Sequence, residues 1–363
     1  MGLASRNHDY LARADLDLPL GTAEDRLPLQ HDEDLGVVVP VQGGATAGRR
    51  LHEEEGHANP VVVPSLEPER VVAVREFIVL DHLHGCQYAA VLAEAVDLLR
   101  CPVCGGGFED GPGALRCGAG HSFDIARQGY VNLVPGSGDT VAMVEAREGF
   151  LGAGHYRRLG EALVEDAAEV CAPGAVVDVG AGTGHHLARV LDALPGRTGL
   201  ALDASSAALR RAAHAHPRVA AVGADVWREL PLRDRVAALV LSVFAPRNAA
   251  EMARVLAPDG VLLAVTPSTR HLHELVGPLG LLSVPDDKAD RLDAQLASHF
   301  ELSARRAVEH SMFLAREEAA QLVGMGPSAW HVDEQAVDER LAVLPDPLTV
   351  TASVSMSRYV RRE

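Results

Sequence analysis

Apolar and polar positions follow two different periods along the second half of the chain. Short apolar runs, which predict buried strands, occupy residues 175–182, 198–205, 219–225, 236–246 and 260–267. The stretches between them have apolar residues three or four positions apart, which predicts amphipathic helices at 185–194, 207–216 and 248–259. Because strands and helices alternate, we expect a parallel sheet with helices on both of its faces.

Three further segments complete this pattern. Residues 140–172 have helical apolar spacing with breaks near Gly152 and Gly154. Residues 348–362 alternate between apolar and polar positions, which predicts a final strand. Residues 98–135 hold three of the five cysteines in a glycine-rich stretch. We therefore expect a small cysteine module over residues 98–135 and an α/β domain over residues 140–363.

Residues 1–90 show no helical or strand periodicity. They mix acidic runs, glycine, proline and short valine runs, which is typical of a disordered extension. A second interpretation is a mis-annotated start, since a domain could begin naturally at Val91 and a GTG codon there can initiate translation. Mass spectrometry of the native N-terminus separates the two, because an abundant peptide from Glu53–Arg70 excludes the later start.

Composition and charge limit the function only loosely. The net charge is −17, of which −9 falls in residues 1–95 and −8 in residues 96–363. An acidic total leaves RNA binding open, but it requires a local basic face for the phosphates. No stretch reaches the roughly 18–20 uncharged apolar residues of a membrane span, and residues 1–10 do not form a signal peptide. We expect a cytoplasmic protein, in which cysteine clusters more often hold metal than form disulfides.

The cysteine module has the ligand spacing of a zinc site. Three cysteines and a histidine fall within 21 residues as C-x2-C-x12-C-x3-H. Tetrahedral zinc takes four nitrogen or sulfur ligands, and each short pair supplies two of them from one turn. A disulfide framework fits a reducing compartment poorly, and a redox C-x-x-C has no use for the second pair. A module this small cannot fold on buried apolar surface alone, so a metal would supply the missing stability. The predicted ligands of a closed, structural zinc site are Cys101, Cys104, Cys117 and His121.

A glycine loop begins two residues after Asp178, in the stretch VVDVGAGTGHH at the end of the first predicted strand. Its glycines, which let a ligand approach the backbone where a Cβ would clash, are Gly180, Gly182 and Gly184. A dinucleotide-binding Rossmann enzyme is the rival interpretation, but its loop has the spacing G-x-G-x-x-G. Asp203 ends the second predicted strand, where a carboxylate can accept both ribose hydroxyls. Asp225 follows the third strand, where it can read an adenine amino group. A plain tight turn is the remaining alternative.

This set resembles the class I S-adenosylmethionine-dependent methyltransferases, whose cofactor has no phosphate to cradle. The chain is similar to the 23S rRNA guanine-N1 methyltransferase family in the order of its zinc module and glycine loop. It also shares four segments with that family: FDIARQGYVNLV, FLGAGHY, ARVLAPDGVLLAVTPSTRHLHEL and PSAW. The resemblance covers about residues 98–358. It implies a Rossmann-like class I methyltransferase sheet with an N-terminal zinc-binding RNA-recognition module. It also implies S-adenosyl-L-methionine and Zn2+ as cofactors, and 23S rRNA as partner, with hairpin 35 of domain II as target and a link to macrolide resistance.

The resemblance also implies cofactor contacts outside the glycine loop. They map onto Tyr156, the pair Leu187 and Ala188, and His271. In the alternative interpretation, Tyr156 is a packing aromatic at a helix end and His271 is a surface residue. The loop departs from the family pattern at Thr183 and His185, which affects side-chain details of the pocket but leaves the role of the backbone.

Methylation of guanine N1 requires an acceptor for the N1 proton and donors for the negative charge that spreads to O6. The sequence identifies no residue for this catalytic role. Phe244 and Trp330 are candidates for stacking on an extruded base, although core packing is the favoured interpretation of each. RNA contacts would come from the zinc module and from arginines that are otherwise ordinary surface charges: Arg127, Arg147, Arg157, Arg158, Arg361 and Arg362. A homodimer holding one RNA between two zinc modules stays open.

Two other functions stay open on the sequence alone. The first is a methyltransferase for a small molecule or protein with a structural zinc knuckle, and a requirement for RNA in the assay would exclude it. The second is a non-enzymatic RNA-binding protein with a decayed cofactor fold. The intact Asp178, glycine loop and Asp203 argue against decay, and calorimetry with the cofactor would test it.

Overall fold

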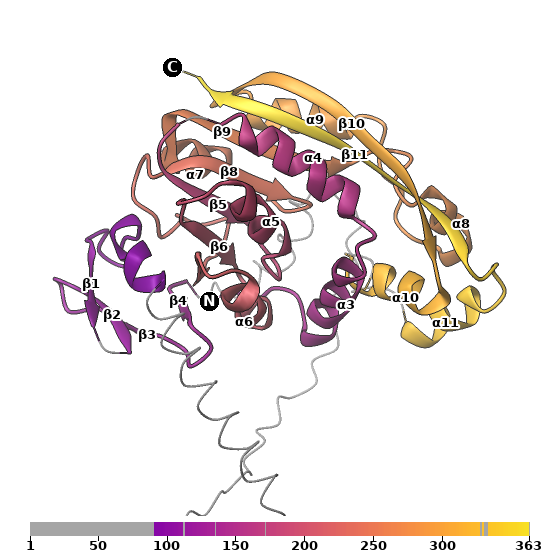
Figure 1. Cartoon of the computed structure of the whole chain (residues 1–363), viewed down its shortest axis with the longest axis horizontal. Helices are drawn as coiled ribbons and strands as arrows, with labels where there is room; N and C mark the ends of the chain where they lie inside the picture. Colours follow the sequence, from indigo (N-terminus) through magenta and orange to yellow (C-terminus); the bar gives the residue numbers. More distant parts are fainter. Residues whose placement is uncertain are drawn as a thin grey trace, which may run out of the picture. The chain divides into compact units, whose positions relative to one another are not determined.

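The computed structural model describes residues 91–111, 113–134, 136–170, 172–326, 329 and 333–362. The extension predicted over residues 1–90 and the stacking candidate Trp330 lie outside the described residues. The first elements are a short 3-10 helix, η1 (Val96–Leu98), and the strands β1 (Phe108–Gly111), β2 (Ala114–Cys117), β3 (Ser122–Asp124) and β4 (Tyr130–Asn132). Strands β1, β2 and β3 form a small antiparallel sheet (Figure 1).

A larger sheet organises the rest of the chain. Its strands after β4 are β5 (Ala175–Val179), β6 (Gly199–Asp203), β7 (Val219–Gly223), β8 (Ala237–Val243), β9 (Leu256–Pro267), β10 (Phe300–Leu314) and β11 (Leu348–Arg361). The eight strands lie in the order β10-β11-β9-β8-β5-β6-β7-β4. Strands β4 to β9 pair in parallel, whereas β11 is antiparallel to both β9 and β10. The winding direction reverses beside β5, and ligands bind at such a switch point, beyond the carboxyl ends of the strands.

Helices cover both faces of this sheet, as the sequence predicts. Their bounds are α3 (Val141–Gly152), α4 (Arg157–Ala168), α5 (His185–Ala193), α6 (Ser206–Ala215), α7 (Ala249–Val255), α8 (His273–Leu279), α9 (Lys288–Leu296), α10 (Arg316–Gly324) and α11 (Glu334–Leu341). The apolar residues of α4, α5 and α6 join one buried cluster with the side chains on one face of the sheet, such as Val176. Those of α7 and α9 join a second cluster with the other face, such as Val177. Side-chain oxygens of Thr140, Ser205 and Asn248 cap the first turns of α3, α6 and α7.

The structure corrects two expectations about secondary structure. The helix expected over 248–259 ends at Val255, and the chain enters β9 at Leu256, whose partner is Ala237 of β8. Strand β10 was not expected, because it is an edge strand in which Phe300, Met312 and Leu314 are the buried positions. With β10 and β11 the sheet is mixed rather than wholly parallel. Among the described residues, no helix has the length and apolarity that a membrane span requires.

The cysteine module is continuous with the large sheet. Strand β4 pairs in parallel with β7 at its edge, and Leu99 forms an isolated antiparallel bridge with Leu232. Leu99, Phe108 and Leu115 belong to the same buried cluster as the residues of α7 and α9. The module and the sheet therefore share one hydrophobic core.

Candidate functional site

The glycine loop lies at the switch point, between the end of β5 and the start of α5. The loop has positive φ at its three glycines, +76° at Gly180, +55° at Gly182 and +76° at Gly184. Residues with a Cβ rarely adopt this region. A Cβ at Gly180 would also stand 2.6 Å from the Cβ of Ala245. Both the backbone conformation and the close packing therefore require glycine, and the loop presents bare backbone at the carboxyl edge of the sheet.

Two predicted acids, Asp178 and Asp203, lie at this loop. Asp203 at the end of β6 accepts hydrogen bonds from the backbone N–H of Gly182 and of Ser205, both 2.8 Å long. Asp178 is 2% exposed, and its Oδ1 has no hydrogen-bond partner among the described residues. Burial, with a smaller contribution from the charge of Asp203, raises the pKa of Asp178 to about 7. An unpartnered buried carboxylate oxygen is costly, and it fits a site that receives a cationic group of a ligand.

Asp225 lies at the end of the next strand, β7. Its Oδ1 accepts the backbone N–H of Trp227 at 3.0 Å, and its Oδ2 lies 3.4 Å from Nε of Arg228. One carboxylate oxygen is thus engaged in a turn, and the other is held by a half-exposed arginine. Three neighbouring strands thus carry an acid at or near their carboxyl ends, as the sequence pattern predicts: Asp178 is the second-to-last residue of β5, Asp203 is the last residue of β6, and Asp225 follows β7 by two residues.

Tyr156 and His271 contact each other, although 115 positions separate them. Tyr156 is 4% exposed and stands at the start of α4, and its Oη lies 3.2 Å from Nε2 of His271. The backbone N–H of Ser353 donates to Nδ1 of His271 at 3.2 Å, so the ring proton is on Nε2 and is donated to Tyr156. Burial lowers the pKa of His271 to about 4, which keeps the ring neutral. The hydroxyl proton of Tyr156 is therefore left to donate to another group.

Phe244 completes this aromatic cluster. Its ring lies 6.0 Å from that of Tyr156 and 5.6 Å from that of His271, centroid to centroid, with both pairs tilted. It follows directly after β8 with φ +53° and is 41% exposed. The favoured sequence interpretation, core packing, is wrong for this residue. An exposed ring held in a strained backbone conformation points to a role beyond stability.

Leu187 and Ala188 lie in the first turn of α5. Leu187 is fully buried in the core, and the N–H of Ala188 donates to the carbonyl of Gly184 at 2.9 Å. The side chain of Leu187 therefore serves packing, and any contact of this pair with a ligand comes through the half-buried Ala188 or the backbone.

The cysteine module brings its four predicted ligands together. One ligand atom from each of Cys101, Cys104, Cys117 and His121 lies within 4.8 Å of all the others. Nδ1 of His121 is 3.2 Å from the sulfur of Cys117 and 3.6 Å from that of Cys101, and the sulfurs of Cys104 and Cys117 are 3.6 Å apart. Tetrahedral zinc with bonds of about 2.0–2.3 Å needs ligand atoms about 3.5–3.8 Å apart. The cluster therefore fits a closed Cys3His zinc site.

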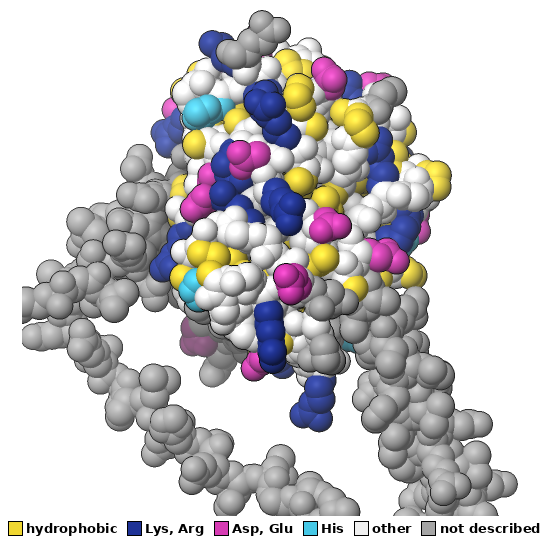
Figure 2. Space-filling view, turned by 90° about the vertical axis from the view of Figure 1, so that its left-hand side faces the viewer, with side chains coloured by type: hydrophobic (Ala, Val, Ile, Leu, Met, Phe, Trp, Pro, Cys, Tyr) yellow, Lys and Arg dark blue, Asp and Glu magenta, His cyan; other side chains and the backbone are white. Residues whose placement is uncertain are grey.

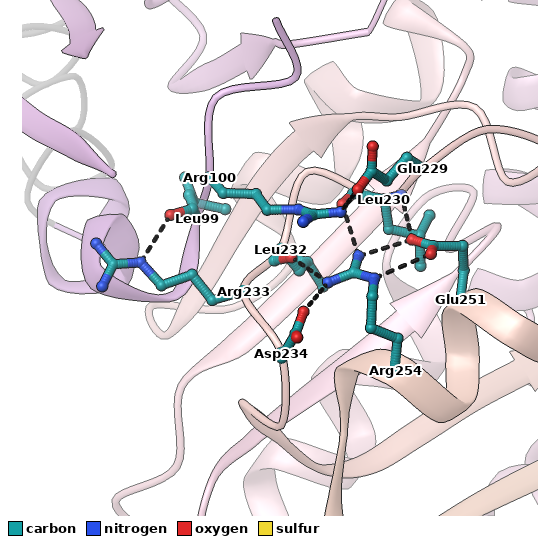
Figure 3. Close-up of polar contacts among 9 residues, drawn as sticks. All are labelled: Leu99, Arg100, Glu229, Leu230, Leu232, Arg233, Asp234, Glu251 and Arg254. Atoms are coloured by element: carbon teal, nitrogen blue, oxygen red, sulfur yellow. Dashed lines mark hydrogen bonds and ion pairs between the residues drawn. The ribbon is translucent and has the colours of Figure 1, made fainter. Parts of the chain in front are cut away.

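Polar contacts fix the zinc module to the loop between β7 and β8 (Figure 3). Nε of Arg233 donates to the carbonyl of Leu99 at 3.2 Å, and Arg100 forms an ion pair with Glu229. Behind this loop, Arg254 of α7 donates to the carbonyl of Leu232 at 2.8 Å. Leu99 and Arg100 precede the zinc ligand Cys101, so these contacts hold the metal site against the large sheet.

Arginines are spread over the surface rather than gathered in one patch. The predicted RNA contacts lie on separate elements: Arg127 between β3 and β4, Arg147 in α3, Arg157 and Arg158 in α4, and Arg361 and Arg362 at the end of β11. On the face that carries β1–β3, Lys and Arg side chains run down the middle with Asp and Glu side chains between them (Figure 2). Three further exposed arginines, which the sequence pattern did not single out, lie in the loop before β8: Arg228, Arg233 and Arg235.

Comparisons with known proteins agree with both parts of the site. A zinc-ribbon family model described as "RlmA, N-terminal" matches residues 99–137, and one described as "Methyltransferase domain" matches residues 176–260. A Micromonospora griseorubida protein named as a 23S rRNA (guanine-N(1)-)-methyltransferase is 52% identical over 72% of this chain and 96% of its own length. The 23S rRNA (guanine(748)-N(1))-methyltransferase of Streptomyces fradiae is 49% identical over the same shares. A Bacillus subtilis protein of this kind, YxjB, is 33% identical over 49% of this chain and 67% of its own length.

Proposed function

The chain belongs to the family of 23S rRNA guanine-N1 methyltransferases, and we propose that it transfers the methyl group of S-adenosylmethionine to N1 of a guanine in 23S rRNA. The observation that carries this proposal is the extent of the likeness: 49–52% identity runs through 96% of two relatives named for this reaction. The Cys3His cluster and the glycine loop, which has the backbone conformation and close packing that require glycine, also support the proposal.

The cofactor, which supplies a methyl group activated on a sulfonium, fits the carboxyl edge of the sheet. It would lie against the bare backbone from Gly180 to Gly184. Asp203 holds the ribose hydroxyls with the lone pairs that its two backbone hydrogen bonds leave free. The buried, unpartnered Oδ1 of Asp178 receives the cationic amino group. Asp225, two residues beyond the end of the neighbouring strand β7, would read the adenine amino group.

The substrate guanine lies against the exposed ring of Phe244. Transfer requires the guanine nitrogen in line with the methyl group, so positioning supplies much of the catalysis. An extruded base is held by stacking on aromatic rings, and Phe244 presents one at the end of β8. Burial raises the pKa of Tyr156, so its hydroxyl stays protonated and acts as a donor toward cofactor or substrate rather than as the base.

The finer proposal is that the target guanine lies in hairpin 35 of domain II, at the position equivalent to 748. The position rests on the name of the Streptomyces fradiae relative, and the hairpin rests on the family resemblance. N1 methylation blocks Watson–Crick pairing, so primer extension on large-subunit rRNA shows a stop at the modified guanine. We expect this stop to vanish in a deletion strain and to return when the gene is restored. A stop that persists in the deletion strain would refute the substrate assignment.

The same strains test the expected link to macrolide resistance, since the deletion should lower the inhibitory macrolide concentration if the modification protects the ribosome. We also propose a cytoplasmic location, which a reaction on rRNA supports. We keep the homodimer as a proposal, in which two zinc modules hold one RNA, and light scattering on the purified protein with and without the hairpin tests it.

A further inference from the structure

We propose that Arg147 binds the carboxylate at the methionyl end of S-adenosylmethionine, and that this contact selects the intact amino-acid donor. This inference rests on the proposed function. It also reassigns Arg147, which the sequence pattern placed among the RNA contacts. The argument depends on where α3 carries this side chain, on what holds it there, and on the charges around it.

The side chain of Arg147, in helix α3, lies against the glycine loop. Nη1 of Arg147 lies 3.3 Å from the point where a Cβ on Gly182 would be, and Cδ lies 3.4 Å from it. Gly182 is the middle glycine of the loop, and its N–H is bound by Asp203. The Arg147 side chain is 24% exposed, so most of it is buried at the loop and withdrawn from the surface where a phosphate backbone would run.

Two acceptors hold the guanidinium in place from different directions. Arg147 forms an ion pair with Asp139 through Nη1, and Nη2 donates to the carbonyl of Met325 at 2.9 Å. Asp139 is itself fixed, because its carbonyl accepts the hydroxyl of Ser205 at 2.7 Å. These contacts use two of the five N–H groups of a guanidinium. The remaining donors are oriented before any ligand arrives.

The charge of Arg147 acts on the pocket. Burial raises the pKa of Asp203 and lowers the pKa of His186 in the first turn of α5, and the charge of Arg147 opposes the first shift and adds to the second. The loop thus has the guanidinium of Arg147, which is paired with Asp139, beside Gly182, and the unpartnered carboxylate oxygen of Asp178 near the end of β5. The methionyl end of the donor is a zwitterion, with a carboxylate and an ammonium on one carbon. Arg147 and Asp178 match its two charges.

The test compares two forms of the donor that differ only in the carboxylate. Binding of S-adenosylmethionine and of decarboxylated S-adenosylmethionine to the zinc-loaded full chain is measured by calorimetry, for wild type, Arg147→Met and Arg147→Lys. We expect Arg147→Met to weaken S-adenosylmethionine binding by about 10- to 100-fold, the range of a charge-assisted hydrogen bond, and to leave the decarboxylated form unaffected. Arg147→Lys should recover part of the loss. The matched control is Arg211→Met. It removes the 3.0 Å ion pair between Arg211 of α6 and Glu148, the neighbour of Arg147 in α3, and it should change neither affinity.

The outcomes separate the roles that Arg147 can have. Equal weakening of both ligands would assign it to structure and overturn the inference. Unchanged donor affinity with a raised KM for the RNA would make it an RNA contact and overturn the inference equally. A wild-type protein that binds neither ligand would refute the proposed function itself. Selective loss of the carboxylate-bearing donor supports the proposal, provided that circular dichroism shows the variant folded.

Discussion

Replacing Phe244 by glycine and by alanine separates the cost of its backbone conformation from the use of its ring. The residue has φ +53°, a region where a Cβ costs about 1–2 kcal/mol. Both substitutions remove the ring, so the difference between them isolates the backbone. Glycine relieves the strain but loses about 0.4–1 kcal/mol through the greater freedom of the unfolded chain. We therefore expect the glycine variant to be the more stable one, by roughly 0.5–1 kcal/mol.

The same two variants test the proposed guanine site. Stacking of a base on an aromatic ring contributes about 1–3 kcal/mol, so kcat/KM for a hairpin transcript should fall about 5- to 150-fold in both. Donor affinity should stay at the wild-type value, because the cofactor is assigned to the glycine loop. Phe244→Tyr keeps the ring and should keep the activity.

Urea unfolding followed by circular dichroism gives the stability difference, and transfer of a tritiated methyl group gives kcat/KM. An alanine variant more stable than the glycine variant would show that the strain argument is wrong. Wild-type kcat/KM in the alanine variant would show that the ring does not contact the guanine. If donor affinity also fell, Phe244 would be assigned to the cofactor site rather than to the substrate site.

Three further predictions follow from the site. Metal analysis should find one zinc per chain, and Cys104→Ser should remove it and lower the unfolding temperature, because metal binding contributes to the stability of the module. Donor binding should persist, because the glycine loop lies at the large sheet; an unchanged zinc content would contradict the assigned ligands. Gly180→Ala should lower the free energy of unfolding by roughly 2–4 kcal/mol, because the backbone strain at positive φ adds to the steric overlap with Ala245. Gly196→Ala is the control: its φ is +74° but nothing lies within 4 Å of its Cβ, so only the backbone strain should lower the free energy of unfolding. Donor affinity should fall as pH drops below about 7, because the ammonium requires Asp178 ionised, and calorimetry on Asp178→Asn should show this dependence removed.

The parts of the site that could be predicted are local in sequence. The zinc ligands fall within 21 residues, and the glycine loop follows its strand directly, so spacing alone indicates their chemistry. The acids at the ends of β5, β6 and β7 could be placed because parallel strands bring their carboxyl ends to one edge. The position of Arg147 could not be found this way. It lies 35 positions before Gly182, and its contact with the loop depends on the packing of α3.

The missed strand has a similar physical cause. Most side chains of β10 are exposed, so its sequence has no apolar alternation to reveal a strand. It forms because β11 offers a complementary backbone along nearly its whole length, from Phe300 paired with Arg361 to Leu314 paired with Leu348. The early start of β9 likewise depends on the pairing of Leu256 with Ala237. Hydrogen bonds to a distant strand determine that β10 forms and where β9 begins. The sequence of one segment alone does not show which strand it will pair with.

The path of the chain connects the two halves of the site more tightly than their sequence separation suggests. After the zinc ligands the chain adds β4 to the large sheet. It then crosses the end of β6, where a Cβ on Gly138 would stand 2.7 Å from the backbone nitrogen of Ser205. Asp139, in the same crossing, pairs with Arg147 at the glycine loop. Strand pairing and close packing thus set the distance from the zinc cluster to the glycine loop, as an in-line transfer to one chosen guanine would require.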